Sequence, residues 1–235
     1  MSLPKPARGY WRVAHRGASA LAAENSAAAL QAALASSVDM VELDVVADGE
    51  RLRLAHSAEQ LLPESLGLSD ALALFSELAG PEVWLDLDVK SPGFEEALLA
   101  ALRAHGLLER TLLTSFHGEV LRAARRLETG IAVGFSYPND RFRLSEKRAL
   151  EPFVDPGLAL LRIPLPLRVG RMVSRARADA AMLHQALVTP LVVHRCHRAG
   201  AAVFAWTVES EEDLRRVIAA GADGAIADDP SLFDD

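Results

Sequence analysis

The sequence contains a single cysteine, Cys196, among 235 residues. A lone cysteine excludes an intramolecular disulfide and favours a reducing compartment, so we expect a cytoplasmic protein. No apolar run approaches the length of a membrane span, and no integral membrane segment is expected. The N-terminal residues lack the apolar stretch of a signal peptide. Glycine-rich loops that hold nucleotide phosphates are also absent, which argues against a P-loop or dinucleotide-binding protein.

Basic residues are in the minority. Lysine and arginine number 25 against 32 aspartates and glutamates, which gives a formal net charge of −7. A negative balance argues against nonspecific binding to nucleic acid or to anionic membranes. Nucleic acid is therefore not an expected partner, and nothing in the composition specifies an oligomeric state.

Short β-like segments alternate with helical segments along the chain, and no low-complexity linker divides it. Half of the residues are hydrophobic, which suits a globular protein with a sizeable core. Alternation with short connections predicts a parallel sheet, and eight strands in this length predict an α/β fold of the (β/α)8 TIM barrel type. We expect one domain over residues 1–235, with a doubly wound sheet as the alternative. The expected strands are 11–15, 40–46, 83–89, 111–115, 131–136, 180–183, 202–208 and 224–227.

The helices between these strands have recognisable starts. Asn25 is the expected N-cap of the first, Thr189 precedes a proline at the first helical position, and Ser210 precedes three acidic residues. Residues 137–179 are too long for one ordinary connection, so we expect helix in part of 158–178 and a segment over the barrel mouth. The other expected helices are 26–36, 69–79, 94–105, 117–127, 190–199 and 211–220.

Two acidic strand segments carry a candidate metal site. Because strand side chains alternate, Glu42 and Asp44 share one face, and so do Asp86, Asp88 and Lys90. Burying several carboxylates together is costly unless a cation or protons compensate. Oxygen ligands suit a hard divalent cation, Mg²⁺ or Ca²⁺. A single pair would be explained by salt bridges on a solvent-facing surface, whereas two pairs favour a metal site.

Two histidines lie where they can converge above these acids. His15 ends the first expected strand, and His56 follows the β-like run 51–55. A neutral imidazole accepts a proton and an imidazolium donates one, so the pair can serve an attacking and a leaving oxygen. Arg16 can hold a phosphate through two hydrogen bonds. A cation and an arginine together would offset the charge of a phosphodiester.

As a set, these residues resemble the glycerophosphodiester phosphodiesterase family, in a short form without its capping insertion. The front motifs are AHRG at 14–17, EN at 24–25, ELD at 42–44 and the histidine at 56. Later motifs also fit, and the resemblance runs from about residue 13 to 233. They are LDLDVK at 85–90, TSF at 114–116, AVFAWTVES at 202–210 and GADGAIADDP at 221–230.

The resemblance implies a TIM barrel and a metal-dependent enzyme that cleaves a small-molecule glycerophosphodiester to glycerol 3-phosphate and an alcohol. It assigns the metal to Glu42, Asp44 and Asp88. It assigns acid–base catalysis to His15 and His56, and phosphate contacts to Arg16 and Lys90. It gives Glu24 and Asn25 supporting roles, and Trp206 the wall of a glycerol pocket.

The chain departs from the family pattern at several positions. Asp88 replaces a usual glutamate, so Asp86 is an alternative ligand; Ser57 replaces an aspartate after the second histidine; and Glu209 replaces an asparagine. The segment between His56 and Asp86 has no room for the cap that many members carry. The loop with Tyr137, Arg141, Phe142 and Arg143 either replaces that cap or is an ordinary loop.

Three other functions are alternatives. A lysophospholipase D-like enzyme would keep the chemistry and change the substrate, a non-catalytic protein would bind a phosphodiester without turnover, and a phosphosugar isomerase would use the same barrel. Two further motifs are expected to be solvent-exposed helix faces. They are HRCH at 194–197, which lacks a second pair of zinc ligands, and the basic stripe of Arg168, Arg171 and Arg175.

Overall fold

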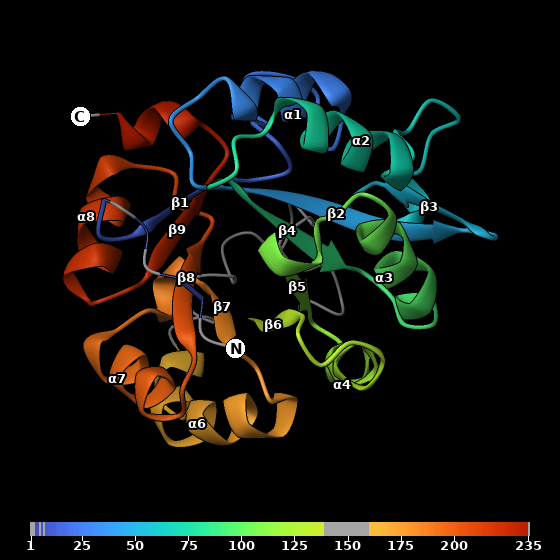
Figure 1. Ribbon diagram of the computed structural model, residues 1–235. Helices are drawn as coiled ribbons and strands as arrows, with labels where there is room; N and C mark the ends of the chain where they lie inside the picture. The colour runs from blue at the N-terminus through green and yellow to red at the C-terminus, as the bar shows by residue number, and fades with distance from the viewer. Residues whose placement is uncertain (1–2, 5, 7, 139–159, 235) are drawn as a thin grey trace.

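The computed structural model describes residues 3–4, 6, 8–138 and 160–234. Eight parallel strands form a closed ring, because β1 pairs with β9 on one side and with β2 on the other. The predicted barrel is confirmed, and an open doubly wound sheet is excluded (Figure 1). In ring order the strands are β1 (Trp11–Ala14), β9 (Gly224–Ala227), β8 (Ala202–Trp206), β7 (Ala180–His184), β6 (Ala132–Tyr137), β5 (Thr111–Ser115), β4 (Trp84–Val89) and β2 (Met40–Asp48).

A hairpin adds a ninth strand outside the ring. β2 continues beyond the barrel to Asp48, and β3 (Arg51–Leu54) returns antiparallel to it. This return directs the chain back to the barrel mouth, where His56 and the 3-10 turn η1 (Ala58–Gln60) follow. The hairpin is therefore the reason that a histidine distant from β1 reaches the same end of the barrel as His15.

The helices surround the strands, as the outer ring of Figure 1 shows. Each predicted helix is present, and the helix expected within 158–178 is observed as α6. The helices are α1 (Ala27–Leu34), α2 (Leu68–Leu78), α3 (Glu95–Ala104), α4 (Gly118–Leu127), α6 (Leu165–Ala176), α7 (Pro190–Arg198) and α8 (Glu211–Ala219). Short 3-10 segments are η2 (Leu108–Arg110), η3 (Gln185–Leu187) and η4 (Pro230–Phe233).

The predicted helix caps are correct at α7 and α8 and wrong at α1. The hydroxyl of Thr189 accepts from the Val192 amide, and that of Ser210 accepts from the Asp213 amide. At α1 the cap is Ser26, which accepts from the Ala29 amide. Asn25 lies one residue outside the helix in a left-handed conformation, with φ of 57°, and its side chain bonds elsewhere.

Aromatic side chains close the barrel interior at the end where the strands begin. Trp11 packs edge-on against Trp84 with ring centroids 5.7 Å apart, and it also contacts Phe204. A Cβ on Gly224 would lie 2.4 Å from the Phe204 ring, so glycine is required there. These residues belong to a buried apolar layer below the polar end of the barrel. The polar side chains at the strand carboxyl ends therefore rest on a packed floor.

A second apolar core lies between the sheet and the helices. It takes one stripe from each helix, such as Leu98, Leu99 and Leu102 of α3, and outward-facing strand residues such as Leu43 and Leu87. Among the described residues, no helix is both long and apolar enough to cross a membrane.

Candidate active site

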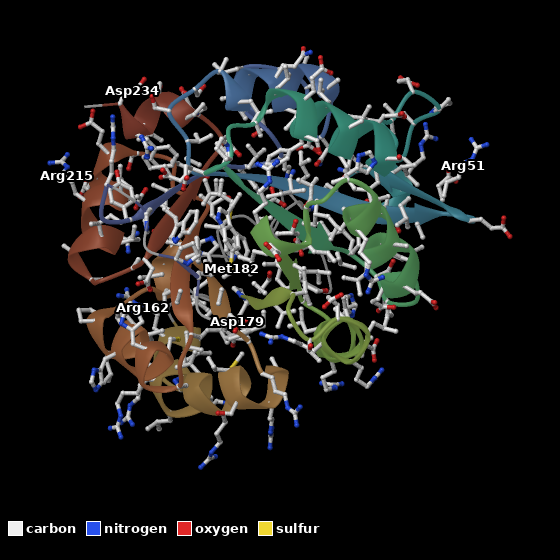
Figure 2. The ribbon with its side chains drawn as sticks, in the orientation of Figure 1. Arg51, Arg162, Asp179, Met182, Arg215 and Asp234 are labelled. Atoms are coloured by element: carbon white, nitrogen blue, oxygen red, sulfur yellow. The ribbon has the colours of Figure 1, made fainter. Side chains whose placement is uncertain are left out.

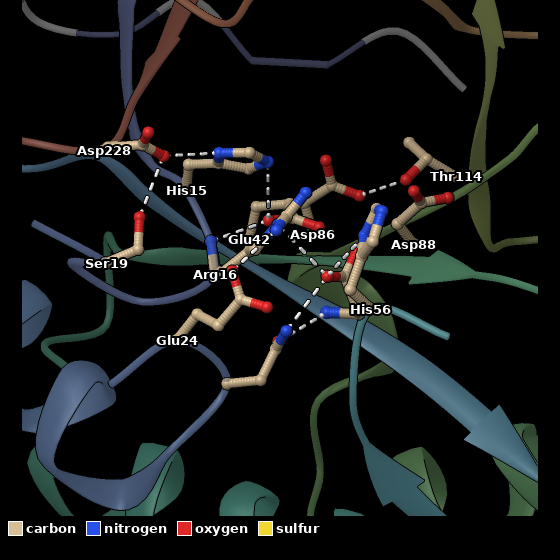
Figure 3. A network of polar contacts seen from close by, with 12 residues as sticks. His15, Arg16, Ser19, Glu24, Glu42, His56, Asp86, Asp88, Thr114 and Asp228 are labelled. Carbon is tan, nitrogen blue, oxygen red and sulfur yellow. Dashed lines mark hydrogen bonds and ion pairs between the residues drawn. The ribbon is translucent and has the colours of Figure 1, made fainter. Parts of the chain in front are cut away.

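The carboxyl ends of the strands surround a cavity of ≈ 660 Å³. Eight of the predicted site residues line it, from β1, β2, β4, β8 and their following loops. Asn25 and Asp44 lie directly behind this lining, both buried and hydrogen-bonded to each other. The eight lining residues are His15, Arg16, Glu24, Glu42, His56, Asp88, Lys90 and Trp206. All ten predicted residues therefore gather at one end of the barrel, and Figure 3 labels six of them: His15, Arg16, Glu24, Glu42, His56 and Asp88.

Glu42, Asp44 and Asp88 form a compact acidic cluster. The register of β2 and β4 places Asp44 beside Asp88, and one carboxylate oxygen from each of the three lies within 4.8 Å of the others. Burial, together with Asp44 nearby, raises the pKa of Glu42 well above its usual value. Burial opposes ionisation of Asp44 too, but Lys90, His56 and Arg16 outweigh it and hold the pKa of Asp44 well below its usual value. The cluster can hold a divalent cation.

Lys90 supplies a positive charge within this cluster. Its ammonium group bridges Asp44 and Asp88 and lies 2.5 Å from Asp88 Oδ2. Although burial disfavours a charged amine, the two carboxylates and Glu42 raise the pKa of Lys90 above its usual value. Asp88 Oδ1 is buried without a hydrogen-bond partner in the described structure. The carboxylates of this site already surround one cation, the Lys90 ammonium, and one of their oxygens has no hydrogen-bond partner. Such oxygens are suitable ligands for a divalent metal.

The loop after β1 is built around two left-handed residues. Arg16 has a φ of 51°, and its backbone amide donates to Glu42 Oε2 at 2.7 Å. Its guanidinium donates to Glu24 at 2.6 Å, and its Nε lies 3.3 Å from Asp44 Oδ2. Gly17 is needed next, because its φ is 79° and a Cβ would lie 2.7 Å from the Cβ of Ala29. The loop thus packs on α1 while directing a cation into the cavity.

Asn25 fixes the position of Asp44. Its amide nitrogen donates to Asp44 Oδ2 at 2.9 Å, and its side-chain oxygen accepts from the Asp44 backbone amide at 2.9 Å. The supporting role expected for Asn25 therefore has a geometric basis, although the predicted helix cap does not.

His15 is held by a residue that the sequence analysis did not single out. Its Nδ1 lies 2.6 Å from Asp228 Oδ1, and Ser19 donates to the same oxygen at 2.8 Å. On the other side of the ring, Nε2 lies 3.9 Å from Glu42 Oε2. A carboxylate at Nδ1 places the ring proton there and leaves Nε2 facing the acidic cluster. The available signal was the position of Asp228 immediately after the last strand.

His56 approaches the cluster from the hairpin side. Its Nδ1 lies 3.3 Å from Asp44 Oδ2. Ser57 stands where the family usually has an aspartate, and the carboxylate in contact with the ring is that of Asp44. The Ser57 hydroxyl is buried and has no hydrogen-bond partner in the described structure. The two histidines therefore flank the acidic cluster, each in contact with one of its carboxylates.

Asp86, the alternative metal ligand, is not a member of the cluster of three, although the register of β2 and β4 places it beside Glu42. Thr114 donates to its Oδ1 at 2.7 Å, while Oδ2 is buried without a partner in the described structure. Burial raises the pKa of Asp86 well above its usual value; the Thr114 hydrogen bond opposes this, and Asp88 adds to it. The geometry thus favours Asp88 over Asp86 as the third member of the acidic cluster.

Aromatic rings form one wall of the cavity. Trp206 stands edge-on to Phe116 with centroids 6.2 Å apart and to His184 at 5.2 Å. Phe116 lines the cavity beside His117, a histidine that the sequence analysis assigned no role. The sequence signal available for His117 was its position between the end of β5 and the start of α4.

The HRCH motif lies outside the site. In HRCH, Cys196 is buried, and His197 contacts Asp223 at 2.6 Å; neither histidine joins a metal cluster among the described residues. Tyr137 ends β6, whereas Arg141, Phe142 and Arg143, offered as a replacement cap, fall outside the described residues.

Known proteins are similar to this chain in sequence and in architecture. A model of the Glycerophosphoryl diester phosphodiesterase family matches residues 15–48 and 87–232, so His56 and Asp86 fall between the matched segments. A glycerophosphodiester phosphodiesterase of Caldanaerobacter subterraneus subsp. tengcongensis is 26% identical, over 94% of this chain and 95% of its own.

Solved structures show the same fold. An Oleispira antarctica phosphodiesterase in complex with the product sn-glycerol-3-phosphate has a TM-score of 0.72 at 21% identity, covering 95% of this chain and 96% of its own. A glycerophosphodiester phosphodiesterase from Agrobacterium tumefaciens has a TM-score of 0.69 at 18% identity, covering 95% and 98%. Since the family model spans the loop after β1, all of β2 and nearly everything from the middle of β4 onward, the chain belongs to the glycerophosphoryl diester phosphodiesterase family.

Proposed function

We propose that this protein hydrolyses a glycerophosphodiester to glycerol 3-phosphate and an alcohol, with a divalent cation as cofactor. The observation that carries the proposal is the convergence of three carboxylates, two histidines and two cationic side chains at one end of the barrel, in and directly behind one cavity, in a chain from this family. In the overall reaction, phosphorus gains an oxygen from water, its bond to the alcohol oxygen breaks, and that oxygen gains a proton.

The residues proposed to hold the cation are Glu42, Asp44 and Asp88. When bound, Mg²⁺ or Ca²⁺ would supply Lewis-acid stabilisation of charge on the phosphate oxygens. Asn25 serves this site indirectly, because its two hydrogen bonds fix the carboxylate of Asp44. Asp88 stands where the family usually has glutamate and is one methylene shorter, but its carboxylate still belongs to the cluster. This supports a catalytic protein over one that binds a phosphodiester without turnover.

His15 and His56 are the proposed acid–base pair. One accepts the proton of the attacking hydroxyl, from water or from a neighbouring hydroxyl of the substrate, and the other protonates the leaving oxygen. Their placement on two sides of the cluster supports this division, since attack and departure in a displacement occur on opposite sides of phosphorus. Asp228 acts through His15 by fixing which nitrogen of the ring carries the proton.

Arg16 and Lys90 are the proposed phosphate contacts. Both are positively charged and line the cavity, and Glu24 holds the guanidinium of Arg16. Trp206, packed between Phe116 and His184, offers an apolar face to the carbon skeleton of the glycerol portion. The cytoplasmic location stays a prediction from the single cysteine, Cys196. This cysteine is buried, and burial raises the pKa of its thiol to about 12.

The test incubates the purified protein with glycerophosphocholine, in separate reactions with Mg²⁺, Ca²⁺ and EDTA. Glycerol 3-phosphate and choline should appear together with at least one metal and not with EDTA. His15→Ala should remove the product while circular dichroism shows an intact fold. Release of glycerol with phosphocholine would contradict the proposal, because that pair arises from cleavage on the other side of phosphorus. A parallel reaction with lysophosphatidylcholine distinguishes a lysophospholipase D-like enzyme.

A further inference from the structure

The outward surfaces of α6 and α7 carry an unbalanced positive charge. Between residues 160 and 208 the chain has seven arginines and one acidic residue, Asp179. Asp179 is largely buried and pairs with Arg125 of α4, so it does not neutralise the surface. We define the α6–α7 face by its exposed arginines, which are Arg162, Arg168, Arg171, Arg175, Arg195 and Arg198.

The two helices bury their apolar stripes and leave these arginines outside. Val169 and Val173 of α6 and Val192 and Cys196 of α7 are buried, and the two helices pack side by side (Figure 1). Most side chains that point outward from α6 and α7 in Figure 2 end in nitrogen. No arginine of the face forms an ion pair with another described residue, so their charges are directed toward solvent and any partner there.

Aliphatic side chains adjoin the arginines at one end of the face. Leu160, Ile163 and Leu167 are 69%, 75% and 75% exposed, the highest values for large apolar residues in the described structure, and Leu191 is 52% exposed. Leu167 lies in the first turn of α6 and Leu191 in the first turn of α7. Helices of a (β/α)8 barrel begin at the end where the strands finish. The aliphatic residues therefore lie at the same end of the barrel as the cavity mouth.

We propose that the α6–α7 face docks the protein on an anionic phospholipid bilayer. Arginines are attracted to the negative lipid surface, and exposed leucine and isoleucine side chains can enter the boundary between headgroups and acyl chains. The net charge of −7 argues against attraction of the whole surface to an anionic membrane, but this face is locally basic, and exposed charges more than about 8 Å away are largely screened at physiological ionic strength. Docking with the aliphatic end foremost turns the cavity mouth toward the membrane.

The aliphatic residues favour a lipid partner over a nucleic acid. Single-stranded nucleic acid binds through basic side chains combined with aromatic stacking platforms. The described residues exposed on this face include arginines, histidines and aliphatics, and none of them is Phe, Tyr or Trp. Docking and the proposed hydrolysis are independent, since none of these arginines lines the cavity.

The experiment measures co-sedimentation of the full chain with phosphatidylcholine vesicles, with and without phosphatidylglycerol. Binding should require phosphatidylglycerol and weaken as salt is added. Arg168→Gln/Arg171→Gln should lower the partition coefficient about 25-fold, because each arginine near an anionic surface accounts for about fivefold. Arg51→Gln/Arg215→Gln is the matched control: it removes the same charge from sites away from the face and should bind like the wild type (Figure 2).

A second variant tests the aliphatic contribution. Ile163→Ser/Leu167→Ser keeps every charge and should also weaken vesicle binding, while hydrolysis of soluble glycerophosphocholine stays at the wild-type rate in both face variants. Absence of binding to phosphatidylglycerol vesicles at low salt would overturn the proposal. So would equal losses in the face and control variants, binding to RNA but not to vesicles, or a dimer in solution that dissociates in the Arg168→Gln/Arg171→Gln variant.

Discussion

Asp228 Oδ1 lies 2.6 Å from His15 Nδ1, which joins the residue after the last strand to the residue after the first. The His15 partner lowers the pKa of Asp228, so the carboxylate is ionised at neutral pH and accepts from the ring. Ser19 donates to the same oxygen and fixes the carboxylate in turn. This chain of three side chains sets which nitrogen of His15 faces the acidic cluster.

Asp228→Asn should lower kcat without abolishing activity. An asparagine can place an N–H at His15 Nδ1 and reverse the preferred tautomer, so we expect a loss of about tenfold or more. His15→Ala should lose more, about 10²- to 10⁴-fold. Steady-state kinetics with glycerophosphocholine give both values, and the pH profile of kcat should shift for Asp228→Asn. Wild-type kcat and an unchanged profile would assign Asp228 a structural role only.

Asp88→Asn should abolish stabilisation by divalent metal, and Asp88→Glu should retain it. The asparagine removes an anionic ligand from the cluster, whereas glutamate keeps the charge with one more methylene. At a metal concentration about 100 times Kd, binding should stabilise the wild type by about 2.7 kcal/mol. Calorimetric Tm with Mg²⁺ or Ca²⁺ measures this directly. If Asp86→Asn rather than Asp88→Asn removes the Tm increase, Asp86 is the ligand.

Asp86→Asn should stabilise the metal-free protein more as pH rises. The folded state raises the pKa of Asp86, so folding favours the neutral carboxyl group. The wild-type protein therefore loses stability as pH rises through the pKa of Asp86 in the folded state. Asparagine cannot ionise and can still accept from Thr114. The difference in free energy of unfolding should be small near about pH 4 and reach about 1–3 kcal/mol at about pH 8.

Urea unfolding in EDTA at several pH values gives this difference. Glu50→Gln, at an exposed position in the β2–β3 hairpin, is the control and should show little dependence on pH. A gain for Asp86→Asn of equal size at every pH would show that packing, not ionisation, is responsible.

Gly17→Ala should destabilise the protein more than Gly49→Ala. Both glycines have positive φ, 79° and 61°, so each substitution carries a backbone cost of about 1–2 kcal/mol. At Gly17 the new Cβ would also meet Ala29 at 2.7 Å, whereas at Gly49 nothing lies within 4 Å. The contact should add about 1–3 kcal/mol. Thermal unfolding compares the two, and equal losses would mean that the loop moves away from α1 without cost.

The strand pattern was readable because each barrel strand is buried and bounded by helical segments. Alternation likewise predicted that Glu42 and Asp44 share a face of β2 and that Asp86 and Asp88 share a face of β4, and the closed ring brings Glu42, Asp44 and Asp88 together. Asp228 could not be found this way, since its partner His15 lies 213 positions away and no local period links them. The error at Asn25 has a physical origin: asparagine favours both helix caps and left-handed turns, and contact with Asp44 selects the turn.

Closure of the barrel between β1 and β9 sets when the protein can become active during synthesis. His15 is synthesised well before Asp228 and the strand that precedes it, because 213 positions separate the two residues. Until then β1 has an unpaired edge, and His15 lacks the carboxylate that orients its ring. A chain released early would therefore be an open sheet, exposed to aggregation, with an incomplete histidine site. Catalytic competence in this fold arrives only after β9 and Asp228 have been made.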